Sequence, residues 1–281
     1  MTTAINCQDS NIKHDIDGND NSAQNTLIGD SDSEYHLCYY PPVLRGHMTF
    51  SVKEYRELKP REYVSDNLVD FVVRYIVHQQ TLEKQKRVLV LESVFFQHLD
   101  LKDRVGGDDD VNELRNCNLW EEGSPDTIIL PLCHHNHWIV LVAILDPRLP
   151  QIYVLDSLGG RTKDTREAKL FGDCLMRKRK NDFKDEFEVI VPNVPEQPNY
   201  EDCGLFVIQY VKEVVSNPDK FRSLSRSGNL SEWFHINVVR KLRGELAELV
   251  ISLAKEQRKV NGVLEGKDLR IPDIDFEKVR V

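Results

Sequence analysis

The chain has 281 residues, of which 40% are hydrophobic, and carries a formal net charge of −9 at pH 7. Its acidity argues against a general nucleic-acid binder, and we find no run of about 18 apolar residues that would predict a membrane-spanning helix. The six cysteines are scattered, which is typical of reduced thiols in the nucleus or cytoplasm, so we expect a monomer of one domain with tails, without cofactor, nucleic acid or membrane partner.

The two ends of the chain are polar. Residues 1–36 are rich in Asp, Asn and Ser and predict a disordered acidic tail, because they bury too little apolar surface to offset the entropy of ordering. Within this tail, LIGDSDSEY at 27–35 has the pattern of a segment that adds a strand to a partner, although a solvated linker fits its composition better. Residues 258–281 predict a second tail, which leaves 37–257 for the folded domain.

The first half of the domain predicts a helix, a strand and a loop. Within residues 58–80, Ser65 or Asp66 can cap a helix whose apolar side chains recur at helical spacing. Residues 87–99 predict a short buried strand that runs into a helix. Residues 100–126 contain GGDDD and little periodicity, and they predict a long acidic loop.

The middle of the chain predicts the centre of a sheet. Residues 127–145 contain two strand-like runs, and 138–145 is apolar on both faces, as expected of a strand that is covered on both sides. The connector DPRLP breaks the chain, and a second strand follows at 151–160. This short connector favours an antiparallel hairpin in which residue 145 lies opposite residue 151.

Four further elements are predicted after the hairpin. Residues 163–180 predict a helix whose basic end, RKRK, also has the composition of a nuclear import signal, although a solvated helix end fits better. Residues 187–195 predict a third strand. A helix is expected from Cys203 onward, and one or two more helices within 230–257.

A cysteine stands at the junction in NYEDCGLFVIQYV, where polar turn formers give way to an apolar run. The run predicts a buried helix that begins at Cys203. A helix N-terminus lowers the pKa of a thiol and so favours the nucleophilic thiolate, while Gly204 is expected to leave room for a substrate backbone. Taken alone, such a cysteine is more often structural than catalytic.

His137 and Asp156 extend this interpretation. In the predicted hairpin His137 starts one strand and Asp156 ends its neighbour, so the imidazole and the carboxylate belong to the same end. The carboxylate can orient the imidazole, which can protonate a leaving amine. Gln197, six residues before Cys203, can donate a hydrogen bond to an oxyanion. The four residues together predict a Cys–His–Asp acyl-transfer site, although each alone also fits a structural role.

The stretch CHHNH offers a competing interpretation, a zinc site. On one strand Cys133, His135 and His137 would project from the same face. However, no second pair of ligands follows at the right spacing, and a structural zinc ion needs four. We therefore expect no metal.

The ordered motifs resemble the ubiquitin-like-protein-specific cysteine proteases, the SUMO (sentrin) proteases. The stretches that match are HWIVLVAIL, IYVLDSLGG and VPEQPNYEDCGLFVIQYV. The residues that match are His137-Trp138, Asp156-Ser157-Leu158, Gln197 and Asp202-Cys203-Gly204. The resemblance covers about residues 38–257, and its C-terminal part looks closest to the branch that trims poly-SUMO chains.

This resemblance implies an α+β, papain-like cysteine protease fold with a short mixed or antiparallel central sheet flanked by helices. It also implies hydrolysis after the C-terminal Gly-Gly of SUMO, with SUMO and SUMO-conjugated proteins as partners. A protease for another ubiquitin-like modifier and a non-catalytic SUMO-binding module are the alternatives that remain.

The resemblance also implies substrate-binding residues. Trp138 matches one wall of a tunnel that admits only glycine near the thiolate, although an indole at this position equally fits core packing. Many family members carry Trp-Leu-Asn-Asp before the first helix, where this chain has Tyr63-Val64-Ser65-Asp66. Tyr63 stands in place of the indole, and the retained Asp66 is expected to meet a basic residue of the modifier.

Overall fold

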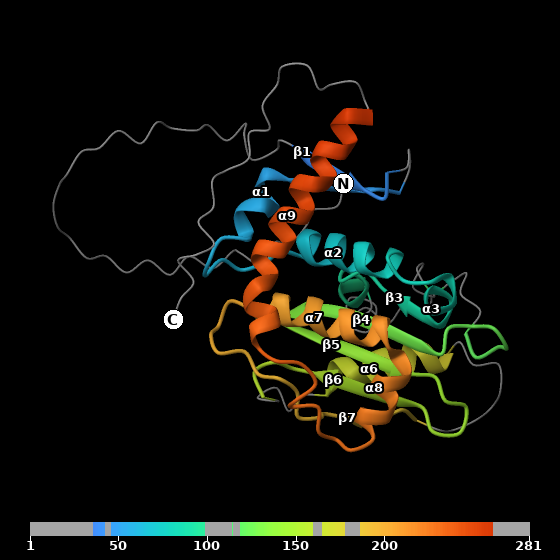
Figure 1. Ribbon diagram of the computed structural model, residues 1–281. Coiled ribbons are helices and arrows are strands. Elements are labelled where there is room, and N and C mark those ends of the chain that lie inside the picture. The colour runs from blue at the N-terminus through green and yellow to red at the C-terminus, as the bar shows by residue number, and fades with distance from the viewer. Residues whose placement is uncertain are drawn as a thin grey trace.

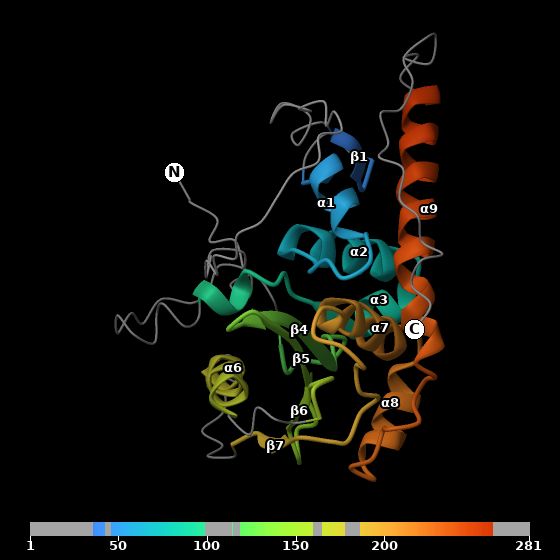
Figure 2. The ribbon, with the colours of Figure 1, turned by 90° about the vertical axis from the view of Figure 1, so that its left-hand side faces the viewer.

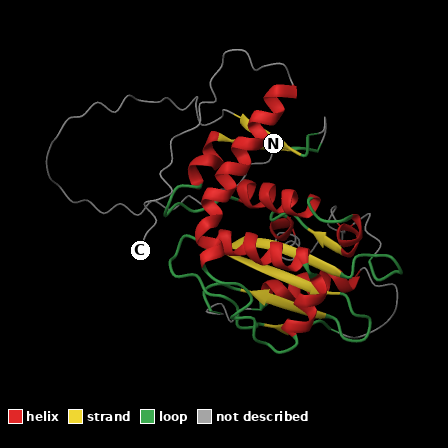
Figure 3. Cartoon of the chain, viewed as in Figure 1, coloured by secondary structure: helices red, strands yellow, loops and turns green. Residues whose placement is uncertain are grey.

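The computed structural model describes residues 36–42, 46–98, 114, 119–159, 165–177 and 186–260. Helices and strands are mixed along the chain, as the sequence predicts (Figure 3). No helix within these ranges is both long and apolar enough to cross a membrane. The predicted N-terminal tail lies outside the described residues except for its last residue, and so do the RKRK segment apart from its first residue and most of the acidic loop.

Five strands form the central sheet in the spatial order β3-β4-β5-β6-β7 (Figure 1). The three middle strands are antiparallel to one another, while the edge strands β3 and β7 each run parallel to their neighbour. The sheet is therefore mixed, with the predicted hairpin at its centre. The bounds are β3 Val88–Val90, β4 Thr127–His134, β5 His137–Ile144, β6 Gln151–Leu155 and β7 Glu188–Ile190.

Helices cover both faces of this sheet, which explains why β5 is apolar on both sides (Figure 2). On one face α7 (Cys203–Ser216) lies against β5, and α2 (Asp66–His78) and α9 (Asn237–Val260) pack against α7. On the opposite face α6 (Arg166–Arg177) buries Phe171 against the sheet. Each face has its own hydrophobic core.

The remaining elements surround this frame. Two strands pair antiparallel beside α9, and three short helices join the larger elements. Their bounds are β1 His36–Tyr40, β2 Met48–Ser51, α1 Val52–Glu57, α3 Leu82–Arg87 and α8 Pro218–Ser225. The sequence analysis predicted none of these five, and β1 and α9 each extend into the stretches assigned to tails.

Two details of the predicted sheet are wrong. Ile144, not residue 145, lies opposite Gln151, while the Leu145 backbone N–H points to the other neighbour and donates to the Asp126 carbonyl at 2.9 Å. The third strand is also shorter than predicted. β7 ends before Pro192, whose nitrogen has no hydrogen to donate to a ladder.

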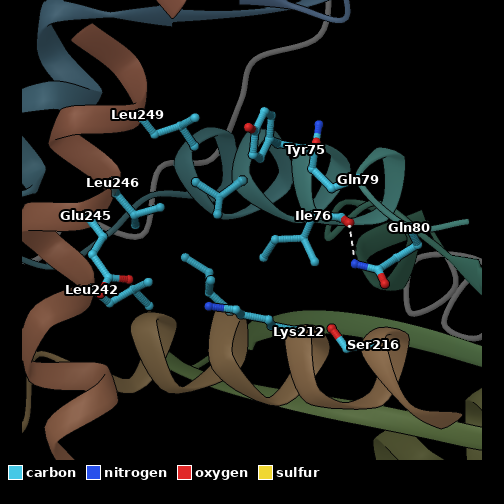
Figure 4. Close-up of a pocket in the computed structure, with 12 residues that line it drawn as sticks. Tyr75, Ile76, Gln79, Gln80, Lys212, Ser216, Leu242, Glu245, Leu246 and Leu249 are labelled. Carbon is cyan, nitrogen blue, oxygen red and sulfur yellow. Dashed lines mark hydrogen bonds between the residues drawn. The ribbon is translucent and has the colours of Figure 1, made fainter. Parts of the chain in front are cut away.

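A cavity of about 310 Å³ lies where α2, α7 and α9 meet (Figure 4). Leu242, Leu246 and Leu249 from α9 face Ile76 of α2 across it. The three helices therefore pack less tightly here than around the buried start of α7.

Candidate active site

His137 is placed by a tight turn. It is the first residue of β5, directly after a two-residue turn whose members, His135 and Asn136, have φ of 50° and 60°. Two successive positive φ values are the signature of a type I′ hairpin turn, which matches the twist of the flanking strands. The turn sets the register in which His134 lies opposite His137.

This turn also removes the premise of the zinc interpretation. His135 lies in the turn, so Cys133, His135 and His137 do not share one strand face. His134 is already paired through Nδ1 with Glu167 at 2.6 Å. Among the residues that the structure describes, no group of three His, Cys, Asp or Glu side chains is arranged to hold a metal ion.

Asp156 follows β6 and lies beside His137. Its carboxylate Oδ1 is 2.7 Å from His137 Nε2 and also accepts the Leu158 backbone N–H at 2.9 Å. Asp156 is only 2% exposed. Neighbouring antiparallel strands thus bring the acid and the imidazole together, and the backbone contact holds the carboxylate in place.

Cys203 completes a series of hydrogen bonds. It is the first residue of α7, as predicted, and is buried. The His137 ring hydrogen-bonds its side chain. Because Nε2 faces Asp156, Nδ1 is the nitrogen left for the sulfur. The structure therefore joins Cys203, His137 and Asp156, three residues from three separate segments.

The charge state of His137 follows from this arrangement. Burial lowers its pKa, but the hydrogen bonds to Asp156 and Cys203 and the charges of both groups outweigh burial and raise the pKa to about 9. The imidazole is consequently protonated at neutral pH. The Cys203 side chain and a protonated imidazole therefore stand side by side, which is the pairing that a sulfur nucleophile and a proton donor require.

Gln197 is held by two neighbours of the site. Its Oε1 accepts from Ser157 Oγ at 2.6 Å, and its Nε2 donates to the Asn199 carbonyl at 2.7 Å. The amide nitrogen has two hydrogens, so this contact leaves a second N–H for an oxyanion. The sequence analysis did not assign a role to Ser157 or Asn199, although Ser157 directly follows the predicted acid.

Trp138 is buried against the start of α7. It is 3% exposed, and its Nε1 donates to the Val64 carbonyl at 3.2 Å. A Cβ on Gly204 would overlap Val64 Cγ2 and lie 3.2 Å from Trp138 Cδ1. The room that was predicted for a substrate backbone at Gly204 is therefore filled by Val64 and Trp138.

Tyr63 and Asp66 flank this contact. Tyr63 is 49% exposed and precedes Val64, the residue that covers Trp138. Asp66 is the first residue of α2, after Ser65, which is the N-cap. Burial raises the pKa of Asp66, and its Oδ1 has no hydrogen-bond partner within the described part of the chain. Both residues lie on the segment that packs over the indole.

Asp202, the residue directly before Cys203, forms an ion pair with Arg243. Asp202 is the N-cap residue of α7, but its side chain makes no capping hydrogen bond. Its Oδ1 instead lies 2.7 Å from Arg243 Nη2, and its Oδ2 accepts from Asn199 Nδ2 at 2.8 Å. Sequence reasoning missed Arg243, which lies in the second turn of α9.

Comparison with known proteins gives a consistent result. A family model described as the C-terminal catalytic domain of the Ulp1 protease family matches residues 62–251. Probable ubiquitin-like-specific protease 2A of Arabidopsis thaliana is 26% identical over 273 residues, which cover 85% of this chain and 34% of that protein. Sentrin-specific protease 7 of Rattus norvegicus is 20% identical over 300 residues, which cover 79% and 29%. The chain spans about a third of the length of these relatives.

A solved structure described as a crystal structure of the de-sumoylating protease superposes with a TM-score of 0.66. The match covers 80% of this chain and 94% of that chain, at 18% sequence identity. At this identity the likeness establishes the fold alone. It confirms the α+β protease fold that the resemblance implies.

Proposed function

Because this chain belongs to the Ulp1 protease family, we propose that it is a thiol isopeptidase that cleaves after the C-terminal Gly-Gly of SUMO. The observation that carries the proposal is the hydrogen-bonded series from Cys203 through His137 to Asp156. It supplies a nucleophile, a proton donor and an orienting acid, the set that acyl transfer by a cysteine needs.

The reaction has two stages. The Cys203 thiolate attacks the carbonyl carbon of the terminal glycine, and the oxyanion that forms accepts from the Cys203 backbone N–H and from Gln197 Nε2. His137 gives its proton to the leaving lysine amine as the C–N bond breaks, which leaves a thioester. The neutral imidazole then takes a proton from water, the resulting hydroxide attacks the thioester, and the thiolate is released. Asp156 stabilises the imidazolium in both stages.

The proposed substrates are SUMO conjugates, with poly-SUMO chains as the preferred class. The C-terminal part of the sequence, which resembles the branch that trims poly-SUMO chains, supports chains over precursors. In this proposal Tyr63, Asp66 and Trp138 contact the modifier near its C-terminus. The protein acts as a monomer in the nucleus or cytoplasm, where thiols such as Cys38 and Cys203 stay reduced.

Purified protein is expected to release SUMO from a conjugate, and Cys203→Ser is expected to lower the rate by about 10⁴-fold or more. Cys133→Ser is the matched control, since Cys133 is a partly exposed thiol outside the hydrogen-bonded series. Gel analysis of a poly-SUMO chain and of a single conjugate reports both activity and preference. Cleavage that survives in Cys203→Ser would refute the proposal.

A panel of modifiers with an electrophilic C-terminus separates the alternatives. SUMO is expected to label Cys203, as located by mass spectrometry of the digested protein. Labelling by another ubiquitin-like modifier in place of SUMO would identify a different protease. Binding of SUMO without labelling would identify a non-catalytic module.

A further inference from the structure

An aspartate directly before the nucleophile poses an electrostatic problem. The negative charge of Asp202 disfavours a thiolate on the next residue. Aspartate is also a preferred N-cap, whose carboxylate ordinarily accepts from the N–H groups of the first helical turn. Those N–H groups are the ones that a thiolate or an oxyanion at Cys203 needs.

The structure turns the Asp202 carboxylate away from α7. Oδ1 accepts from Arg243 Nη2 at 2.7 Å, Oδ2 accepts from Asn199 Nδ2 at 2.8 Å, and the side chain makes no capping bond. The Arg243 side chain is 6% exposed, so water screens this pair little. Both oxygens of the carboxylate are therefore occupied, and its charge is balanced.

Arg243 is itself rigidly fixed. Nη1 donates to the carbonyl of Glu57 at 2.8 Å and to that of Lys59 at 2.9 Å. Nη2 donates to the carbonyl of Glu62 at 2.8 Å in addition to Asp202. The guanidinium is thus held by three backbone carbonyls, one from the last residue of α1 and two from the loop that follows it, and it meets Asp202 in a fixed orientation.

We propose that Arg243 is a positioning residue for the nucleophile. By holding and neutralising Asp202, it keeps the first turn of α7 free to stabilise the Cys203 thiolate and the oxyanion. This inference rests on the proposed function, since it assigns a device that prepares the same cysteine for attack.

A purely structural role for Arg243 is the competing explanation. The three carbonyl contacts tie down the loop that leads to Tyr63 and Val64, so losing Arg243 also loosens that loop. One substitution at Arg243 cannot separate the two roles. A double-mutant cycle with Asp202 can, because only the positioning role acts through the Asp202 charge.

The experiment measures the rate at which iodoacetamide alkylates Cys203 as a function of pH, by mass spectrometry of its peptide. Arg243→Gln is expected to move the midpoint of this profile upward by about one pH unit, about a tenfold loss of rate at neutral pH. In the Asp202→Asn background, the same substitution is expected to change the rate less than about threefold. Alkylation needs no SUMO, so it tests this inference even if the protein cleaves another modifier.

Two outcomes would overturn the inference. One is an unchanged profile in Arg243→Gln, and the other is an equal loss in both backgrounds, which would mark a structural role.

Thermal unfolding shows whether each variant is folded. If Arg243→Gln does not fold, Arg243→Lys, which keeps the charge, is compared with wild type. A midpoint within about 0.3 pH units of wild type supports the role of charge, and an upward shift like that expected for Gln overturns it.

Discussion

The starts of α2 and α7 lie close together, joined by the contact between Val64 and Gly204, yet they are built differently. At α2, the Ser65 side chain accepts the Leu68 backbone N–H at 3.4 Å, which caps the helix. At α7, the Asp202 carboxylate hydrogen-bonds Arg243 and Asn199 instead, so it does not cap the helix. A side chain caps the first turn of α2, whereas no side chain caps the first turn of α7, as the proposed role of Arg243 requires.

This difference shows how a fold can keep a site reactive. A capped N-terminus gains about 1 kcal/mol, and α7 forgoes that gain beside its cysteine. The deep burial of α7 compensates, because eleven of its residues are buried. The reactive end of the helix is therefore stabilised by its packing and not by its cap.

The largest expected effect concerns the carboxylate beside His137, the residue that interacts with Cys203 at the start of α7. Asp156→Asn is expected to lower activity about 10²-fold at pH 8, because the neutral amide no longer stabilises the imidazolium. Since Asp156 helps to raise the pKa of His137 to about 9, its loss lowers that pKa and moves the alkaline limb of the pH–rate profile to lower pH. An alkaline limb that stays in place would contradict the assignment of His137.

Gly204→Ala tests the contact between the two helix starts. The new methyl group overlaps Val64 Cγ2 and crowds Trp138, so we expect a loss of about 1–3 kcal/mol in unfolding free energy. Activity is expected to fall as well, because the displaced neighbours lie beside Cys203. Denaturant unfolding and conjugate cleavage measure the two effects. Wild-type values in both would show that the packing here is loose.

Ser65→Ala removes the side-chain cap of α2, the kind of cap that α7 lacks. We expect a cost of about 1 kcal/mol in unfolding free energy, since the Leu68 N–H loses its side-chain partner. The alkylation profile of Cys203 is expected to stay within experimental error. A shift in that profile would mean that the two helix starts are coupled more tightly than their separate hydrogen bonds suggest.

The smallest effect is expected at Gly244, a helical glycine next to Arg243. A Cβ at this position meets nothing within 4 Å, so Gly244→Ala is expected to stabilise the protein by about 0.5–1 kcal/mol. It is the matched control for Gly204→Ala, because it adds the same methyl group to a glycine in another helix. A clear destabilisation would show that α9 is constrained near Arg243.

Much of the site could be predicted because its parts lie at the ends of regular elements. An apolar run fixes where a strand or helix begins, so Cys203 and His137 were placed correctly at the starts of α7 and β5. The hairpin brought Asp156 to the same end even though the predicted register was wrong by one residue. The conclusion survived because a one-residue shift moves a strand by only about 3.3 Å.

Other features could not be read from the sequence. Arg243 lies near Arg240 and Lys241 in a basic stretch of α9, and periodicity alone does not tell which of the three is buried. Only Arg243 is, because the α1–α2 loop folds over it and offers carbonyls from far away in the chain. The six-residue helices α1 and α3 were missed because so few residues show little periodicity.

The side chain of Gln257 imitates a peptide group. Its Nε2 donates to the Tyr39 carbonyl at 2.6 Å, and its Oε1 accepts the Tyr39 N–H at 3.0 Å. The last turns of α9 thereby lie against β1 (Figure 1). Arg243 lies in the second turn, near the other end of that helix. β1 and the last turns of α9 therefore form one unit at this end of the helix, about 20 Å along the helix axis from the Arg243 guanidinium, so a change in this contact is separated from Cys203 by most of the length of α9.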